Sequence, residues 1–394
     1  MKWEKVKLSE VTEYITDGDH QPAPKSDSGV LFVKIKDIQD NCLTFDNALF
    51  VPQEYYNQLP KNRKAVYGDT LYTVVGSYGI PAFVNHNIPF CFERNIALLH
   101  PNNRVIPKYL YYAVKNPIFY GNANNIANGS AQKLIPLSKL AGMEVSVPPI
   151  ERQETIVNIL SAYDELIENN QKQIKLLEEA AQRLYKEWFV DLRFPGHETT
   201  PIVDGVPEGW KEQSLYQIAD VVMGQSPKSE YYNQVGEGLP FHQGVGSYGN
   251  RFVSDETYST SFTRIAEAGS ILFSVRAPVG RLNLTKNKVV IGRGLAAINH
   301  RRGAQSYLFY LLKEKFFRDD IIGNGSIFAS ISKEELLNQT FLIPIDSLVG
   351  QFNGIAGGID KKIDILSEQI RLLTEARDHL LPKLMSGEIE VENI

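Results

Sequence analysis

Two long stretches of the sequence contain basic side chains but no acidic residue. Neither aspartate nor glutamate occurs from Arg94 to Met143 or from Ala268 to Lys313. Ammonium and guanidinium groups bind phosphates, and arginine also binds the edge of guanine through two hydrogen bonds. We therefore expect each stretch to contribute a surface that faces a polyanion. The bases of the two stretches are Arg94, Arg104, Lys108, Lys115, Lys133 and Lys139, and then Arg276, Arg281, Lys286, Lys288, Arg293, Arg301, Arg302 and Lys313.

The individual candidates for phosphate or base contacts include polar loop residues as well as bases. Arg94 and Arg293 each precede an apolar run typical of a buried strand, so each could instead pair with a nearby carboxylate. The segments 128–130 and 324–326 both read Asn-Gly-Ser, which is typical of a turn, although its free N–H groups could also hold a phosphate. The tetrad Gly-Ser-Tyr-Gly occurs at 76–79 and 246–249, either by coincidence or as two contacting loops. An ordinary solvated surface is the alternative for Arg276, Arg281, Arg301 and Arg302. The complete set of candidates is Lys34, Lys36, Ser77, Tyr78, Arg94, Ser130, Lys133, Gln243, Ser247, Tyr248, Arg276, Arg281, Arg293 and Ser326.

The residues that usually carry catalysis lack the spacing that catalysis needs. Cys42 and Cys91 form no CxxC pair, and the seven histidines show no HxxxH or HExxH spacing, so we expect no metal site. The sequence has no Asn-Pro-Pro-Tyr or Asp-Pro-Pro-Tyr adenine-methylation motif, no Walker motif, and only a lone Gly-x-Gly at 292–294. We therefore expect no catalytic residue and no cofactor in this chain.

Length and composition indicate a folded protein of several domains. The chain has 394 residues, of which 43% are hydrophobic, and its net charge is −5. A single core seldom grows beyond about 250 residues. No apolar run reaches the roughly 18 residues that span a bilayer, and the first residues do not resemble a signal peptide, so we expect a cytoplasmic protein.

An internal repeat organises the whole chain. Similar segments recur in the same order at an offset that falls from 201 to 196 residues. Each match is weak alone, but their unbroken order indicates a duplication. The matched pairs are Tyr67–Val74 with Ala268–Val275, Arg94–Leu99 with Arg293–Ile298, Tyr109–Tyr112 with Tyr307–Tyr310, Asn128–Ser130 with Asn324–Ser326, and Val147–Pro148 with Ile343–Pro344.

Each repeat ends in a long heptad pattern. Apolar residues alternate at spacings of four and three, which is typical of a coiled-coil helix. Two such helices of about 40 residues, roughly 60 Å long, can bury their seams on each other. Pro382 and Gly387 are expected to mark the end of the second helix, while Asn170 and Arg377 interrupt the seams, and Asn170 could fix the register. The seams are Ile156, Leu160, Tyr163, Ile167, Asn170, Ile174, Leu177, Ala181, Leu184 and Trp188, and Phe352, Ala356, Ile359, Ile363, Leu366, Ile370, Leu373, Arg377, Leu380 and Leu384.

These patterns predict an α+β fold in which two globular domains are joined by two long antiparallel helices that form a coiled coil, with an internal pseudo-two-fold repeat. We expect globular domains at residues 1–147 and 208–345, a central helix and linker at 148–207, and a C-terminal helix at 346–394. Because the major groove recurs on one face of DNA about every 34 Å, such a molecule suits a split DNA target. The two halves should differ because the loop sequences differ.

Several motifs resemble those of the DNA specificity subunits of type I restriction-modification systems, and the resemblance spans the chain. They are Trp3–Leu8, Trp210–Leu215, Gly68–Leu71, Pro148–Ile156 and His379–Ile389. The resemblance implies two target-recognition domains that read a bipartite, asymmetric sequence in double-stranded DNA. It also implies that the helices dock two modification subunits, which methylate adenine with S-adenosylmethionine, and that restriction subunits using ATP and Mg²⁺ join the complex. The alternatives are a stand-alone DNA-modifying enzyme and a coiled-coil scaffold without a DNA role.

Overall fold

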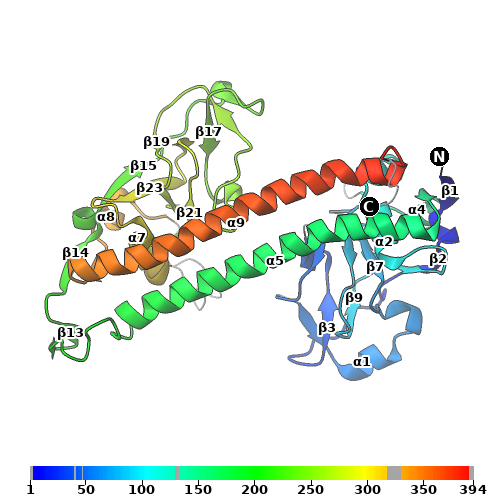
Figure 1. Ribbon diagram of the computed structural model, residues 1–394, viewed down its shortest axis with the longest axis horizontal. Coiled ribbons are helices and arrows are strands. Elements are labelled where there is room, and N and C mark those ends of the chain that lie inside the picture. The colour runs from blue at the N-terminus through cyan, green and yellow to red at the C-terminus, as the bar shows by residue number, and fades with distance from the viewer. Residues whose placement is uncertain (1–2, 40, 47, 129–132, 317–329, 390–394) are drawn as a thin grey trace. The chain divides into compact units, whose positions relative to one another are not determined.

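The chain forms two compact units, each with a globular part and portions of two long helices (Figure 1). The computed structural model describes residues 3–39, 41–46, 48–128, 133–316 and 330–389. One unit comprises Met1–Asn170 and Gln369–Ile394, and the other comprises Gln171–Glu368. The long helices are α5, Ile150–Phe189, and α9, Asp346–Ser386, so both unit boundaries lie within a helix.

The first globular part is built on a four-stranded antiparallel sheet with the order β2-β10-β7-β8. A three-stranded sheet, β6-β3-β9, has β3 and β9 parallel, and β1 pairs with β11. The strands are β1 Glu4–Lys7, β2 Thr12–Asp17, β3 Val30–Val33, β4 Ile38–Gln39, β5 Cys42–Leu43, β6 Leu49–Val51, β7 Thr70–Thr73, β8 Pro81–Phe83, β9 Phe90–Phe92, β10 Ile96–Pro101 and β11 Glu144–Val147. The helices are α1 Gln53–Gln58, α2 Pro107–Lys115, α3 Pro117–Ile126 and α4 Leu137–Ala141.

The second globular part repeats this plan. Its four-stranded antiparallel sheet has the order β15-β23-β20-β21, and its second sheet, β16-β18-β17-β22-β19, has β17 and β22 parallel. The strands are β14 Lys211–Ser214, β15 Ala219–Met223, β16 Tyr232–Asn233, β17 Leu239–His242, β18 Tyr258–Ser259, β19 Ile265–Ala266, β20 Ile271–Ser274, β21 Leu282–Leu284, β22 Val289–Ile291, β23 Leu295–His300 and β24 Thr340–Ile343. The helices are α6 Leu215–Ile218, α7 Gln305–Phe316 and α8 Lys333–Leu337, and the hairpin of β12 Ile202–Val203 and β13 Val206–Pro207 precedes this part.

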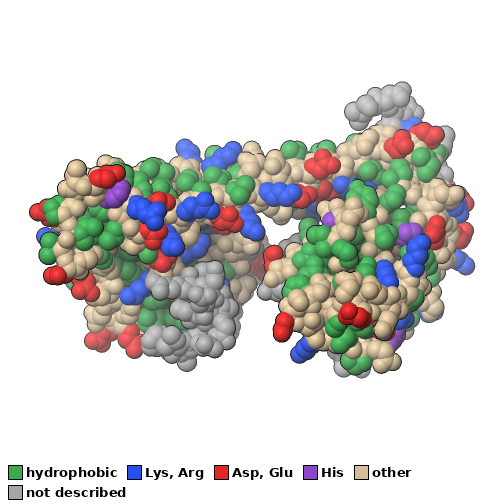
Figure 2. Space-filling view, turned by 90° about the horizontal axis from the view of Figure 1, so that it is seen from below, with side chains coloured by type: hydrophobic (Ala, Val, Ile, Leu, Met, Phe, Trp, Pro, Cys, Tyr) green, Lys and Arg blue, Asp and Glu red, His purple; other side chains and the backbone are tan. Residues whose placement is uncertain are grey.

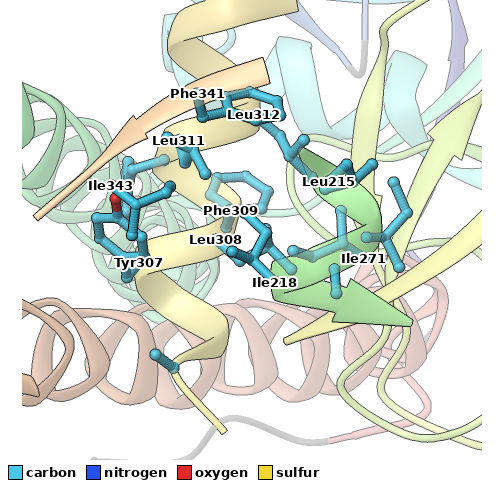
Figure 3. Close-up of a cluster of buried hydrophobic side chains, with 14 of the residues drawn as sticks. Leu215, Ile218, Ile271, Tyr307, Leu308, Phe309, Leu311, Leu312, Phe341 and Ile343 are labelled. Atoms are coloured by element: carbon cyan, nitrogen blue, oxygen red, sulfur yellow. The ribbon is translucent and has the colours of Figure 1, made fainter. Parts of the chain in front are cut away.

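Both faces of each four-stranded sheet are buried. Successive side chains of a strand point to opposite faces, so Leu71 packs toward the smaller sheet while Tyr72 packs toward α2 and the long helices. Leu272 and Phe273, their equivalents in the second repeat, divide in the same way. Figure 3 shows the second helix-side core, in which side chains of α7 lie against those of α6, β20 and β24. The matching topologies confirm the predicted α+β fold and internal repeat, whereas the rotation that would relate the two units stays a prediction.

The heptad seams are buried or half-buried along both helices, which confirms the predicted coiled coil. Within the first unit, Asn170 Nδ2 donates to Gln369 Oε1 at 3.3 Å and Arg377 Nη1 lies 2.8 Å from Asp164 Oδ1, so the helices are antiparallel. Each polar seam residue therefore contacts the opposite helix: Asn170 forms a hydrogen bond with α9, and Arg377 forms an ion pair with α5. Pro382 does not mark the end of α9, because the helix continues to Ser386 and ends before Gly387, which has a φ of 74°.

A half-buried aspartate joins the globular part to the helices in each unit. The hydroxyl of Tyr112 donates to Asp164 Oδ2 at 2.6 Å in the first unit. Tyr310 donates to Asp360 Oδ1 at 3.1 Å in the second, where Arg251 also ion-pairs with Asp360. Because 196 residues separate the two aspartates, the repeat preserves this contact. Among the described residues, no helix is long and apolar enough to cross a membrane.

Candidate nucleic-acid interface

Three loops of the first unit surround a surface hollow that contains two of the predicted DNA contacts. The loops follow β2, β3 and β9, and they bring together Gly18, Lys34 and Arg94. Lys34 and Arg94 both line the hollow because β3 and β9 are parallel neighbours whose ends lie side by side. A Cβ atom at position 18 would lie 2.0 Å from the carbonyl oxygen of Phe92, so only glycine lets the first loop cross the end of β9. We call this site the first hollow.

The second unit has an equivalent hollow with different side chains. The loops that follow β15, β17 and β22 bring together Ser226, Gln243 and Arg293. Pairing of Phe241 with Val290 corresponds to pairing of Phe32 with Cys91, and this register places Gln243 where the first repeat has Lys34. Gly224 corresponds to Gly18, since its Cβ would lie 2.1 Å from the carbonyl oxygen of Gly292. We call this site the second hollow.

The negative charge at the first hollow is largely engaged by its neighbours. Burial alone would raise the pKa of Asp19, but hydrogen bonds from the Gln21 N–H and the Tyr55 hydroxyl, together with the charge of Arg63, lower it. Arg63 Nη1 lies 3.2 Å from Asp19 Oδ1. Glu93 Oε1 accepts a hydrogen bond from the Ile35 N–H at 2.8 Å. Both carboxylates therefore already have partners within the protein.

The acid-free stretches do not form acid-free surfaces. Figure 2 shows Lys and Arg side chains beside Asp and Glu side chains over the face in view. Acids from other parts of the chain supply these partners, so several of the bases already have an ionic partner within the protein. Ion pairs of 2.5 to 3.9 Å join Arg104 to Glu4, Lys115 to Asp164, Lys286 to Asp364, Lys288 to Glu267, Arg301 to Asp220 and Arg302 to Asp346.

Five candidate bases differ from that group. Within the part of the chain that the structure describes, no ion pair engages Lys34, Arg94, Lys133, Arg276 or Arg293. Arg94, Arg276 and Arg293 are also exposed. The alternative that Arg94 and Arg293 pair with nearby carboxylates is therefore wrong for the described residues. Their charges are available to an external anion.

A second group of candidates lies at the turn between β7 and β8. Ser77 is exposed there, and the Gly76 N–H donates to the carbonyl oxygen of Lys133 at 3.1 Å. Tyr78 stacks on Tyr120 at 6.3 Å between ring centroids, and its hydroxyl donates to Asn124. The equivalent turn of the second repeat carries Arg276, which forms a bridge with Ser330 where Val75 does so with Leu134.

The second Gly-Ser-Tyr-Gly tetrad occupies a different place in the fold. Ser247 Oγ lies 2.9 Å from Nδ1 of the buried His242, whose Nε2 lies 3.1 Å from Asp255 Oδ1. The hydroxyl of Tyr248, which we expected on an exposed loop, is buried, and burial raises its pKa. The two tetrads therefore have no common role that the fold reveals.

The remaining candidates are less informative. Lys36 is exposed, with Nζ 4.0 Å from Asp37 Oδ1. Arg281 is partly buried, and its backbone N–H donates to Ser274 Oγ at 2.8 Å. Ser130 and Ser326 lie outside the described residues.

Sequence reasoning missed Ser226 and Arg251. Ser226 lies in a polar loop that belongs to no repeated motif, and Arg251 lies outside the acid-free stretches. The Gly-x-Gly at 292–294 has a packing explanation, since a Cβ at Gly292 or Gly294 would lie 2.7 Å or 2.5 Å from atoms of Gln243. The described residues contain no cluster of metal-ligating side chains.

Comparisons with known proteins agree with this architecture. The family model described as the type I restriction modification DNA specificity domain matches residues 1–179 and again 207–369. The MjaX type I restriction enzyme specificity subunit of Methanocaldococcus jannaschii is 30% identical over 413 residues, which cover 99% of this chain and 94% of the relative. The HindI specificity subunit of Haemophilus influenzae is 20% identical, over 82% of this chain and 86% of that protein.

A solved structure shows the same fold. The S subunit of a type I restriction-modification system from M. genitalium has a TM-score of 0.59 at 17% identity, with 97% of this chain and 96% of that chain covered. The chain therefore belongs to the family of type I restriction-modification DNA specificity proteins. Its members are the recognition subunits of these systems rather than the catalytic ones.

Proposed function

We propose that the chain reads a bipartite, asymmetric sequence in double-stranded DNA, with one hollow for each half. The observation that carries this proposal is the pair of equivalent hollows, each with an arginine that has no ionic partner among the described residues. Arg94 and Arg293 can bind phosphate or the two acceptors of guanine. The neighbouring residue differs between the hollows, Lys34 in one and Gln243 in the other, so the half-sites should differ.

We further propose that the long helices dock two modification subunits. Leu176 on α5 is 64% exposed and Leu372 on α9 is 50% exposed, and 196 residues separate them. Each unit thus presents one leucine at the same position of the repeat, as two copies of one partner would require. Adenine methylation with S-adenosylmethionine and any restriction step with ATP and Mg²⁺ would then belong to partner subunits, in the cytoplasm.

The proposal is tested by selecting bound sequences from a random DNA library with the complex of this chain and its modification subunits. We expect two specific half-sites separated by unread base pairs. Arg94→Ala should weaken selection in one half, and Arg293→Ala in the other. Arg104→Ala is the matched control, because this arginine is already paired with Glu4.

Three outcomes would count against the proposal. If no sequence is enriched from the library, the result would favour a scaffold without a DNA role. Methyl transfer by the isolated chain would favour a stand-alone enzyme. Loss of both half-sites in each arginine variant, with an unchanged melting temperature, would contradict separate reading by the two hollows.

A further inference from the structure

The second hollow contains a short chain of hydrogen bonds that fixes the amide of Gln243. The Arg293 backbone N–H donates to Ser226 Oγ at 3.2 Å, and the Ser226 hydroxyl donates to Gln243 Oε1 at 2.8 Å. A hydroxyl has one donor and two acceptor sites, so Ser226 can make both bonds at once. The carbonyl oxygen of the Gln243 amide is therefore engaged inside the protein.

Backbone contacts hold Gln243 in the same position. The N–H of Gly294 donates to the carbonyl oxygen of Gln243 at 3.1 Å, and a Cβ at Gly292 would lie 2.7 Å from Gln243 Oε1. Tyr232 packs on Phe241 at 4.7 Å between ring centroids, which supports the strand that ends just before Gln243. Burial raises the pKa of Tyr232, and the positive charge of Arg293 opposes that rise. Arg293 and Gln243 line the same open hollow.

The two side chains that meet at the ends of β17 and β22, Gln243 and Arg293, present hydrogen-bond donors. Gln243 Nε2 has two N–H groups, and the guanidinium of Arg293 has five and accepts none. The acidic residue that lines the hollow, Glu230, lies 3.8 Å from Lys228 between Oε1 and Nζ, so it already has a cationic neighbour. In the major groove guanine presents two acceptors, N7 and O6, whereas adenine presents one acceptor and one donor. The donors of Gln243 and Arg293 therefore complement the two acceptors of guanine.

We propose that the second hollow reads a guanine, and that Ser226 sets this preference by orienting the Gln243 amide. Without the Ser226 hydroxyl, the amide can turn and offer Oε1 and Nε2 together, which is the arrangement that binds adenine. The inference rests on the proposed DNA-reading function and adds the base and the positioning residue. The first hollow has no such serine–glutamine hydrogen bond, because Lys34 and Glu93 occupy the positions that Gln243 and Gly292 occupy in the second.

The test uses the full chain with its modification subunits and a DNA library randomised over both half-sites. For the natural chain we expect guanine at one position of the second half-site to be preferred over adenine by about 5- to 150-fold, the discrimination of one good two-bond contact. Ser226→Ala should lower the guanine-to-adenine ratio about tenfold, or to about one where the starting ratio is smaller than about ten. The first half-site should stay unchanged. Ser226→Thr keeps the hydroxyl and should keep the preference.

Ser254→Ala is the matched control, since Ser254 lies in the same unit, is exposed and does not line the second hollow. It should behave as the natural chain. A second half-site without a preferred guanine would overturn the inference, and so would an unchanged guanine-to-adenine ratio in Ser226→Ala. If the natural chain selects neither half-site, the proposed function itself fails. Failure of the guanine inference and failure of the proposed function are therefore distinguishable. The first half-site reports folding, because a misfolded variant would lose it as well.

Discussion

Arg251 is the most deeply buried cation among the described residues of the second unit, and its removal should destabilise that unit strongly. Its side chain is 2% exposed and lies against two carboxylates, Glu178 at 3.4 Å and Asp360. The guanidinium also stacks over the Phe309 ring at 4.4 Å. These contacts connect the loop before β18 with α5, α9 and α7.

Replacing Arg251 by Met keeps most of the volume but leaves Asp360 with only the Tyr310 hydroxyl among these partners. Removing one member of a buried pair costs about 3–5 kcal/mol because the remaining charge stays buried. Glu178 and Asp360 keep 28% and 18% exposure, so water screens them partly, and we expect the lower end, about 3 kcal/mol. Adding Asp360→Leu should recover part of the loss, since no unpaired charge then remains at that position.

Urea unfolding followed by tryptophan fluorescence measures this change, because Trp188 and Trp210 both lie in the second unit. The control is Arg302→Met, whose ion pair with Asp346 is 74% and 81% exposed and should be worth less than about 1 kcal/mol. If Arg251→Met and Arg302→Met shift the unfolding midpoint equally, the buried cluster does not stabilise the unit as argued.

Other predictions concern the DNA, the helices and acid stability. Arg276→Ala or Arg293→Ala should weaken DNA binding, by about 1–3 kcal/mol where the arginine contacts a base, and unchanged affinity and salt dependence in a binding titration would make it structural. Asn170→Leu should stabilise the helix pair but permit other registers, and cysteine cross-linking that still finds one register would contradict this. Seven residues inserted into both helices, after 170 and after 368, add about 10.5 Å and should widen the unread gap by about three base pairs; an unchanged gap in the selected sequences would refute the helical spacer. The hydrogen bond from His242 lowers the pKa of Asp255, so the stability it contributes is present above the ordinary aspartate pKa of 3.8 and lost as the pH falls through the lowered value. Asp255→Asn should remove that acid-dependent contribution, and an unchanged dependence of the melting temperature on pH below 4 would show that the bond contributes nothing.

The long-range order of the fold could be predicted from the sequence because it is repetitive. The heptads of α5 and α9 run for many turns, and the repeat recurs in order along the chain, so many weak signals support one another. The prediction that Pro382 marks the end of α9 was wrong because a proline near the end of a long packed helix is tolerated once tertiary contacts hold both sides, and Leu381 and Leu384 are both buried there.

The site was predictable only in part. Lys34 and Arg94 were each singled out, yet their meeting depends on parallel pairing of β3 with β9, which no local spacing reveals. The surface predicted from the acid-free stretches was too basic, because the fold brings acids that are distant in the sequence next to these bases. Asp346 beside Arg302 is one example. Ser226 gave no separate signal, since a serine in a polar loop is common and its importance arises from two hydrogen bonds made across the fold.

The most direct measurement of the central claim is a genome-wide map of methylated adenines in cells that carry this chain with its modification subunits, compared with cells in which residues 1–147 come from a relative. Two unlike half-sites with a fixed gap are expected for the natural chain, and the exchange should alter one half alone. A continuous target, or an exchange that alters both halves, would contradict reading by two separate hollows.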